Sequence, residues 1–364
     1  MAKYRVIQWG VGYTGVSSLR YIVNNPNLEL VGIKCFTREK EGLSARAICG
    51  HGPDDVTATT DIEQILKIDA DCVIFMPRDM FNDPSVPGGP SDAWMAELIA
   101  ILESGMNVSS PLASCISTAQ MANQQAFLDR INAACAKGNS TVTFTGFDPG
   151  FATDYMPFVV ASAVGEVRQI RTWEMLDYAQ YPVAEILHVM GLGIDPSQID
   201  NVRPVIHAIW STGLHLLGES MGEPIDEVRL DIESYLSPRT FTTPGGMEIR
   251  EGQTGALWWK LHGLVGGKER YVINHVTRMS EEMGPDWPRV GVDGGYRIEI
   301  DSFPPVFVDM PLGVAGGGGT AFADAMIMTA ARCVNSIDAV VQATPGYKTF
   351  NELAPIGGKY TFVD

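Results

Sequence analysis

The sequence has too few basic residues for a chain that binds nucleic acid or an anionic membrane surface. It contains 26 Lys and Arg against 43 Asp and Glu, which gives a formal net charge of −17 over 364 residues. A surface this acidic repels phosphate groups at long range. We therefore expect neither nucleic acid nor a membrane as a partner. A small anionic ligand can still bind where local dipoles and a few cations outweigh the distant charge.

Motifs for metal binding and for nucleophilic hydrolysis are also missing. The six cysteines form no Cys-x-x-Cys pair, and neither His-x-x-x-His nor His-Glu-x-x-His occurs. There is no Gly-x-Ser-x-Gly nucleophile motif. No apolar run reaches the ~18 residues that span a bilayer, and residues 1–7 show no apolar signal segment. We expect a cytoplasmic protein with reduced thiols and no metal site.

Apolar runs alternate with amphipathic stretches over the first 150 residues. Strands are predicted at 4–9, 28–36, 71–76, 106–109 and 141–145. Helices are predicted at 16–24, 61–68, 91–104 and 118–137. Strand–helix alternation of this kind predicts an α/β fold with a Rossmann-type, doubly wound parallel sheet.

The pattern changes after residue 150. Helices are predicted around 152–164, 183–192 and 203–221, followed by strands at 228–235, 254–264, 270–281 and 295–302. This region is therefore expected to be an α+β domain with an open, mainly antiparallel sheet. A run of four glycines at 316–319 precedes a predicted helix at 320–342, and the tail from Pro345 to Phe350 is predicted as a loop.

A dinucleotide fingerprint follows the first predicted strand. Gly10, Gly12 and Gly15 form Gly-x-Gly-x-x-Gly between that strand and the first helix. The first glycine permits the tight turn, the second lets a pyrophosphate approach the backbone, and the third lets the helix pack on the sheet. The pyrophosphate then lies at the helix N-terminus, beside Tyr13 and Thr14, where N–H groups and the helix dipole favour negative charge.

The residues after the second strand decide which cofactor phosphate is recognised. Folds that prefer NAD place an Asp or Glu there, which accepts a hydrogen bond from the ribose 2′-OH. This chain has Thr37 and Arg38 instead. A guanidinium can bind a 2′-phosphate through two hydrogen bonds, and a hydroxyl can donate a further one. We expect NADP(H) to be preferred; NAD(H) is the alternative, with Arg38 in solvent and Glu39 facing the ribose.

One segment resembles a known group of enzymes. Residues 145–157 read Thr-Gly-Phe-Asp-Pro-Gly-Phe-Ala-Thr-Asp-Tyr-Met-Pro. They are similar to the Gly-x-Asn-Pro-Gly-Phe-x-x-Asp-x-Leu-Pro segment of the dihydrodipicolinate reductase-like superfamily. Within it, the chain resembles the 2,4-diaminopentanoate dehydrogenase and NADPH-dependent amine dehydrogenase group, with Asp148 where that group has Asn. The resemblance covers nearly the full length and includes the Pro345-Gly346-Tyr347 tail.

This resemblance implies a domain arrangement. Residues 1–150 and 320–364 would form the dinucleotide-binding domain, and residues 151–319 the domain for substrate binding and dimerisation. A homodimer is therefore expected. The nicotinamide would lie near the carboxyl ends of the strands, beside Met76, Pro77, Ser109, Asp148 and Pro149.

The resemblance also implies a substrate pocket, with one departure from the group's pattern. The pocket would include Ala113, Phe151 and Tyr181. In the amine dehydrogenases a Glu that handles the substrate amine stands where this chain has Ala113. Glu174 or Asp177 is the candidate to replace that carboxylate, and Tyr178 is the candidate proton donor to a developing alkoxide. The alternative is that Asp177 and Tyr178 form a structural hydrogen-bonded pair.

Together these features predict an NAD(P)-dependent oxidoreductase that acts on a C=O or C=N centre of a small to medium, partly apolar molecule. Two alternatives stay open. The first is an amine dehydrogenase whose catalytic carboxylate has moved to another position. The second is a dinucleotide-binding sensor without catalysis, which the alanine at position 113 would favour.

Overall fold

The computed structural model describes residues 3–77, 92–118, 121, 124–181 and 184–362. Contacts divide the chain into two compact units: the first is residues 1–150 and 326–364, and the second is residues 151–325. The predicted helices at 91–104, 118–137 and 183–192 each include residues that lie outside the described ranges. No helix in the described part of the chain is long and apolar enough to cross a membrane.

The first unit contains a seven-stranded sheet in which every pairing is parallel. Its strands, in spatial order, are β15 (Gly346–Tyr347), β6 (Thr141–Phe144), β5 (Asn107–Ser110), β4 (Cys72–Phe75), β1 (Tyr4–Trp9), β2 (Leu28–Lys34) and β3 (Ala58–Thr59). The chain first moves outward from β1 to β2 and β3, and then in the other direction from β4. The sheet is doubly wound, as predicted, and its order reverses between β1 and β4, where such sheets bind ligands.

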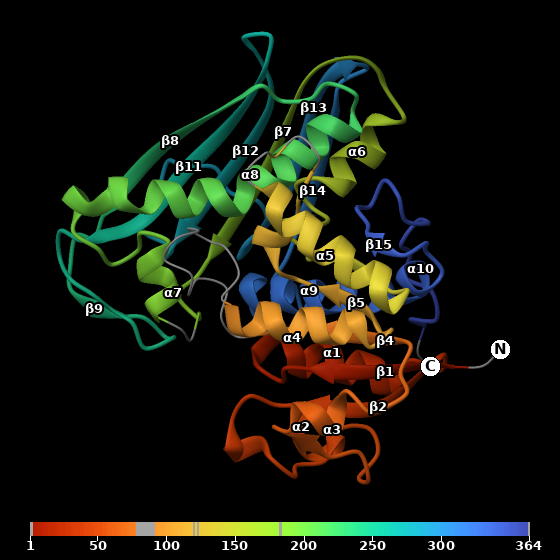
Figure 1. Ribbon diagram of the computed structural model, residues 1–364. Helices are drawn as coiled ribbons and strands as arrows, with labels where there is room; N and C mark the ends of the chain where they lie inside the picture. The colour runs from red at the N-terminus through yellow and green to blue at the C-terminus, as the bar shows by residue number, and fades with distance from the viewer. Residues whose placement is uncertain (1–2, 78–91, 119–120, 122–123, 182–183, 363–364) are drawn as a thin grey trace. The chain divides into compact units, whose positions relative to one another are not determined.

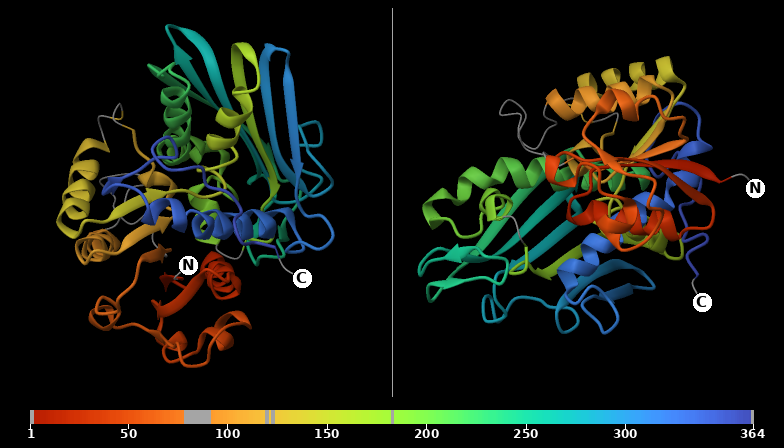
Figure 2. Two further views of the ribbon diagram at one scale, coloured as in Figure 1. Left: turned by 90° about the vertical axis from the view of Figure 1, so that its right-hand side faces the viewer. Right: turned by 90° about the horizontal axis from the view of Figure 1, so that it is seen from below.

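Helices cover both faces of this sheet because right-handed crossovers in opposite directions lie on opposite faces. Figure 2 shows α1 (Tyr13–Asn24) on one face, and α4 (Asp92–Glu103) with α5 (Gln125–Gly138) on the other. Two short helices, α2 (Ala45–Cys49) and α3 (Ile62–Ile65), accompany β2 and β3. The α1 face shares one hydrophobic core with residues of α9 (Ala321–Asn335) and α10 (Ile337–Val341).

The second unit contains a six-stranded mixed sheet. Its strands, in spatial order, are β14 (Val306–Pro311), β13 (Gly294–Phe303), β7 (Gly165–Asp177), β12 (Lys268–Arg278), β11 (Thr254–Val265) and β8 (Glu227–Leu236). Only β7 and β12 are parallel, so the sheet is mainly antiparallel, as predicted. Helix α8 (Arg203–Ser220) lies across β8, β11 and β12 (Figure 1). The unit also contains α6 (Tyr155–Ala161), α7 (Ala184–Val189) and a hairpin of β9 (Phe241–Thr242) and β10 (Glu248–Ile249).

Three predictions about individual elements are wrong. The tail at 345–350 is not only a loop, because Gly346 and Tyr347 add strand β15 beside β6. The helix predicted at 320–342 is interrupted at Ser336. The predicted sheet also lacked β7 and β14, and β7 is central. In its first half the apolar residues Val167 and Ile170 are three positions apart among polar residues, so the alternation that indicates a strand is missing, although β7 pairs on both sides.

Candidate functional site

The glycine turn of the first unit has the backbone geometry that the fingerprint requires. Gly10 has a φ of +95°, and a Cβ added there would lie 2.1 Å from the carbonyl oxygen of Met76. A Cβ on Gly15 would lie 2.2 Å from the carbonyl oxygen of Gly10. In contrast, a Cβ on Gly12 meets nothing within 4 Å in the described part of the protein. Gly10 and Gly15 are thus required by the fold, whereas Gly12 leaves open space in front of the helix.

Two polar residues that no motif singled out hold this turn in place. The side-chain amide of Gln8 donates to the carbonyl oxygen of Gly10 at 2.7 Å. Ser18, on α1, donates to Gln8 Oε1 at 2.5 Å and lies 3.0 Å from the carbonyl oxygen of Gly15. Both side chains are fully buried. They therefore hold the turn from the buried side, and its solvent-facing side stays available to a ligand.

The N-terminus of α1 suits an anion. Gly12 is the N-cap residue and makes no side-chain capping hydrogen bond, and the first turn carries no acidic residue. Tyr13 is 56% exposed, while the hydroxyl of Thr14 is directed to the Met326 sulfur at 3.7 Å. A dinucleotide pyrophosphate fits here, because the backbone N–H groups of the first helical turn and the helix dipole both favour negative charge.

The loop after β2 carries the residues predicted to recognise a 2′-phosphate. Arg38 begins a short 3-10 helix and is exposed, and Glu39 is exposed beside it. The hydroxyl of Thr37 is buried and has no hydrogen-bond partner among the described residues. Lys40 donates from its ammonium group to the carbonyl oxygen of Val11, in the glycine turn. This loop is therefore tied to the turn through Lys40 and presents Arg38 outward.

The remaining predicted cofactor residues lie at the carboxyl ends of β4, β5 and β6. Met76 and Pro77 follow β4 directly, and Met76 is nearly buried. Ser109 is fully buried, and its hydroxyl accepts a hydrogen bond from Ser336 at 2.8 Å. The Ser109 hydroxyl is thus engaged in a hydrogen bond inside the protein. Asp148 and Pro149, joined by a cis peptide bond, belong to the loop after β6.

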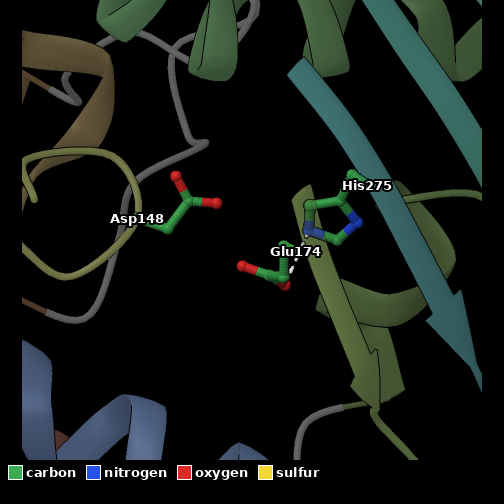
Figure 3. Close-up of side chains that lie close together, drawn as sticks. All are labelled: Asp148, Glu174 and His275. Atoms are coloured by element: carbon green, nitrogen blue, oxygen red, sulfur yellow. Dashed lines mark ion pairs between the residues drawn. The ribbon is translucent and has the colours of Figure 1, made fainter. Parts of the chain in front are cut away.

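In the second unit, a buried carboxylate brings together residues from three neighbouring strands. Glu174 on β7 is only 3% exposed. Its Oε1 accepts from the Tyr178 hydroxyl at 2.5 Å, and its Oε2 accepts from the Tyr296 hydroxyl at 2.6 Å. Nε2 of His275 lies 2.8 Å from Oε1, an ion-pair distance, as Figure 3 shows. A carboxylate is stable at such depth only with partners of this kind.

Strand register explains why these residues meet. Glu174 is paired with His275 on β12 and with Tyr296 on β13. Residues that are opposite one another on adjacent strands point to the same face of the sheet. Thr277, two residues further along β12, lies with its hydroxyl 2.8 Å from Nδ1 of His275. The cluster is therefore a direct product of sheet pairing.

Aromatic rings surround this carboxylate cluster. Trp259 stacks on the His275 ring at a centroid distance of 4.5 Å. Phe322, in the first turn of α9, packs edge-on against Tyr178 at 5.4 Å and against Tyr181 at 4.8 Å. Burial raises the pKa of the Tyr181 hydroxyl. The cluster thus combines a buried carboxyl group with aromatic neighbours, two kinds of group that attract an organic cation.

Glu174 and Asp177 are the two candidates to replace the carboxylate that is missing at Ala113, and the structure places them on opposite faces of the sheet. Asp177 is three residues from Glu174 on the same strand, so its side chain points to the opposite face of the sheet. There its Oδ1 accepts from the backbone N–H of Ala179 at 2.7 Å, and burial raises the pKa of its carboxyl group. Tyr178 bonds to Glu174 and not to Asp177, so the alternative of an Asp177–Tyr178 pair is wrong.

The predicted pocket residues lie in both units. Ala113, in a 3-10 helix after β5, is buried in the first unit. Phe151 and Tyr181 belong to the second, where Phe151 contacts the Tyr155 ring at 6.1 Å. No motif in the sequence marks His275, Tyr296 or Phe322, so these three residues were not predicted.

Comparison with known proteins shows the family. The family model described as the 2,4-diaminopentanoate dehydrogenase C-terminal domain matches residues 151–358, more than half of the chain. The protein belongs to this family. The predicted resemblance is thereby confirmed, as is the prediction of an NAD(P)-dependent oxidoreductase.

Three proteins are similar to this chain over most of its length. An amine dehydrogenase of Streptomyces virginiae is 28% identical over 349 residues, which cover 93% of each chain. The 2,4-diaminopentanoate dehydrogenase of Acetoanaerobium sticklandii is 21% identical over 371 residues, 97% of this chain and 94% of that one. The solved amine dehydrogenase of Mycobacterium smegmatis has the same fold, with a TM-score of 0.78 at 15% identity over 99% of each chain.

Proposed function

We propose that the protein is an NADP(H)-dependent amine dehydrogenase that uses Glu174 as the carboxylate facing the substrate nitrogen. The observation that carries this proposal is the buried Glu174 cluster with the aromatic rings packed against it. An ammonium or iminium centre in a closed pocket requires a nearby negative charge. The names of the two curated relatives, an amine dehydrogenase and a diaminopentanoate dehydrogenase, support the same chemistry.

The proposed reaction is the oxidation of an amine to an imine and its hydrolysis to a carbonyl compound and ammonia, or the reverse. The bound nicotinamide accepts or supplies the hydride. The protein's part is to hold the cationic nitrogen and to manage the proton. Glu174 stabilises the charge, and Tyr178, which donates to it at 2.5 Å, or His275, at 2.8 Å, carries the proton. The two tyrosine hydroxyls keep the carboxylate oriented.

Ammonia dependence tests the amine chemistry. With NADPH and a panel of small, partly apolar ketones, we expect oxidation of NADPH to be at least about tenfold faster with ammonium than without it, because only the imine carries the positive charge that Glu174 binds. The measurement is the initial loss of NADPH absorbance, with equal potassium chloride replacing ammonium chloride as the control. Equal rates in both salts would point to ketone reduction with Tyr178 as the proton donor. No turnover on ketone, imine or amine, despite cofactor binding, would point to a sensor.

Cofactor preference is tested at Arg38. We propose that Arg38 and Thr37 bind the 2′-phosphate of NADP(H). We expect wild-type protein to bind NADPH at least about tenfold more tightly than NADH, a difference of about 1.4 kcal/mol, and Arg38→Ala to lose that preference. Dissociation constants come from quenching of tryptophan fluorescence. Arg20→Ala, an exposed arginine on α1, is the matched control and should keep the preference. If NADH binds equally well to the wild type, NADP(H) is the wrong cofactor.

A further inference from the structure

A buried lysine lies at the carboxyl end of β2 and takes no part in the features described so far. Lys34 is the last residue of that strand, and its side chain is only 5% exposed. Its ammonium nitrogen lies 3.6 Å from Glu97 Oε1 on α4. The other oxygen of Glu97 accepts from the Trp9 indole at 2.8 Å. Burial lowers the pKa of Lys34, whereas Glu97 raises it. Burying such a pair is costly, so an apolar residue would serve packing better.

The ammonium group of Lys34 lies under an aromatic ring. It is 3.6 Å from the centroid of Phe36, which follows β2, and 5.7 Å from that of Trp9. Phe36 is 39% exposed, so part of this residue is accessible to a ligand. A Cβ on Gly10 would lie 3.2 Å from the Phe36 ring. One edge of this ring therefore borders the first glycine of the dinucleotide turn, in the same unit.

We propose that Phe36 is the platform on which the adenine of the dinucleotide stacks, and that Lys34, fixed by Glu97, is a positioning residue for that ring. The face of an aromatic ring is negative, and so is that of a purine, which weakens face-to-face stacking. A cation under Phe36 draws electron density toward itself and makes the outer face a better partner for adenine. The ion pair with Glu97 holds the ammonium group in this place.

The location agrees with the chemistry. The pyrophosphate is expected at Gly12 and the N-terminus of α1, and a 2′-phosphate at Arg38, two residues beyond Phe36. The adenosine connects these two points. Phe36 directly precedes Thr37 and Arg38, which stand where dinucleotide folds that prefer NAD have the acidic residue that bonds to the adenosine ribose. This proposal depends on dinucleotide binding alone and not on the amine chemistry of Glu174, so the two can fail separately.

The first test compares a ligand that contains adenosine with one that lacks it. For Phe36→Ala we expect the dissociation constant of NADPH to rise about tenfold, as for the loss of one aromatic stacking partner of a base, and that of reduced nicotinamide mononucleotide to stay within about twofold. Phe36→Trp should bind NADPH within about threefold of the wild type. Phe362→Ala, which removes a 98% exposed phenylalanine of the same unit, is the control. Unchanged NADPH binding in Phe36→Ala, or equal losses for both ligands, would overturn the proposal.

The second test separates positioning from folding. In Lys34→Met combined with Glu97→Gln, both charges are gone, and the glutamine oxygen can still accept from Trp9. Since replacing a buried ion pair is often neutral or stabilising, we expect the thermal midpoint to be unchanged or higher. The dissociation constant of NADPH should nevertheless rise about threefold, the size of a modest cation–π effect. A double variant that binds NADPH like the wild type would remove Lys34 from the proposal.

Discussion

Glu174→Gln is expected to lower kcat/KM for amine oxidation by about 100- to 1000-fold, or about 3 to 4 kcal/mol of transition-state stabilisation. The substitution keeps the size of the side chain, and its amide oxygen can still accept from one of the hydroxyls of Tyr178 and Tyr296. Its amide nitrogen can donate to the other hydroxyl, which rotates to accept. It removes the negative charge, which is the group that the substrate nitrogen needs. The loss should therefore appear in turnover, while the dissociation constant of NADPH and the thermal midpoint change little. Steady-state kinetics in both directions provides the measurement.

Asp177→Asn is the matched control for this prediction. It removes one carboxylate charge from the same strand, three residues away and on the opposite face of the sheet. We expect kcat/KM to stay within about threefold of the wild type, because this side chain does not point to the Glu174 cluster. If Asp177→Asn were as inactive as Glu174→Gln, the two faces would have been assigned wrongly. If Glu174→Gln kept its activity, the carboxylate that replaces the one missing at Ala113 would have to be sought elsewhere.

The fold was largely predictable because its signals are local. Strands β1, β2 and β4 are apolar runs bounded by glycine or polar residues, and the fingerprint between β1 and α1 shows that the first crossover is a dinucleotide turn. Strand β7 was harder to predict. Its first half is rich in charged residues, and its apolar residues Val167 and Ile170 are three positions apart, so it lacks the period of two that indicates a strand. Strand β15 consists of two residues, which is too short for any periodic signal.

The candidate site was predicted only in part because it depends on register. The sequence singled out Glu174 and Tyr178, which are four residues apart and share one hydrogen bond. His275 and Tyr296 lie 101 and 122 positions further along the chain, and only the pairing of β7 with β12 and β13 brings them to the same carboxylate. Pairing of that kind is set by packing over the entire sheet. The contact between Lys34 and Glu97 could not be predicted for the same reason, because Lys34 lies on β2 and Glu97 on α4, far apart in the sequence.

The second large effect is expected at Gly12, where folding and ligand binding can be separated. Gly12 has φ −73° and ψ −161°, which alanine adopts without strain, and an added Cβ meets nothing within 4 Å among the described residues. Gly12→Ala should therefore fold with an unchanged thermal midpoint. Its methyl group would occupy the space through which the pyrophosphate approaches the backbone, so the dissociation constant of NADPH is expected to rise about 100-fold.

Two other glycines provide the comparison. Gly357→Ala, in the same unit and also with open space around the added Cβ, should change neither stability nor NADPH binding. Gly10→Ala should lose both, because its φ of +95° disfavours alanine and its Cβ would lie 2.1 Å from the Met76 carbonyl oxygen. Differential scanning fluorimetry measures stability and fluorescence titration measures binding. Should Gly12→Ala bind NADPH as tightly as Gly357→Ala, the pyrophosphate does not lie against this turn. Only a loss confined to binding places the cofactor there, because a defect in folding would lower the thermal midpoint as well.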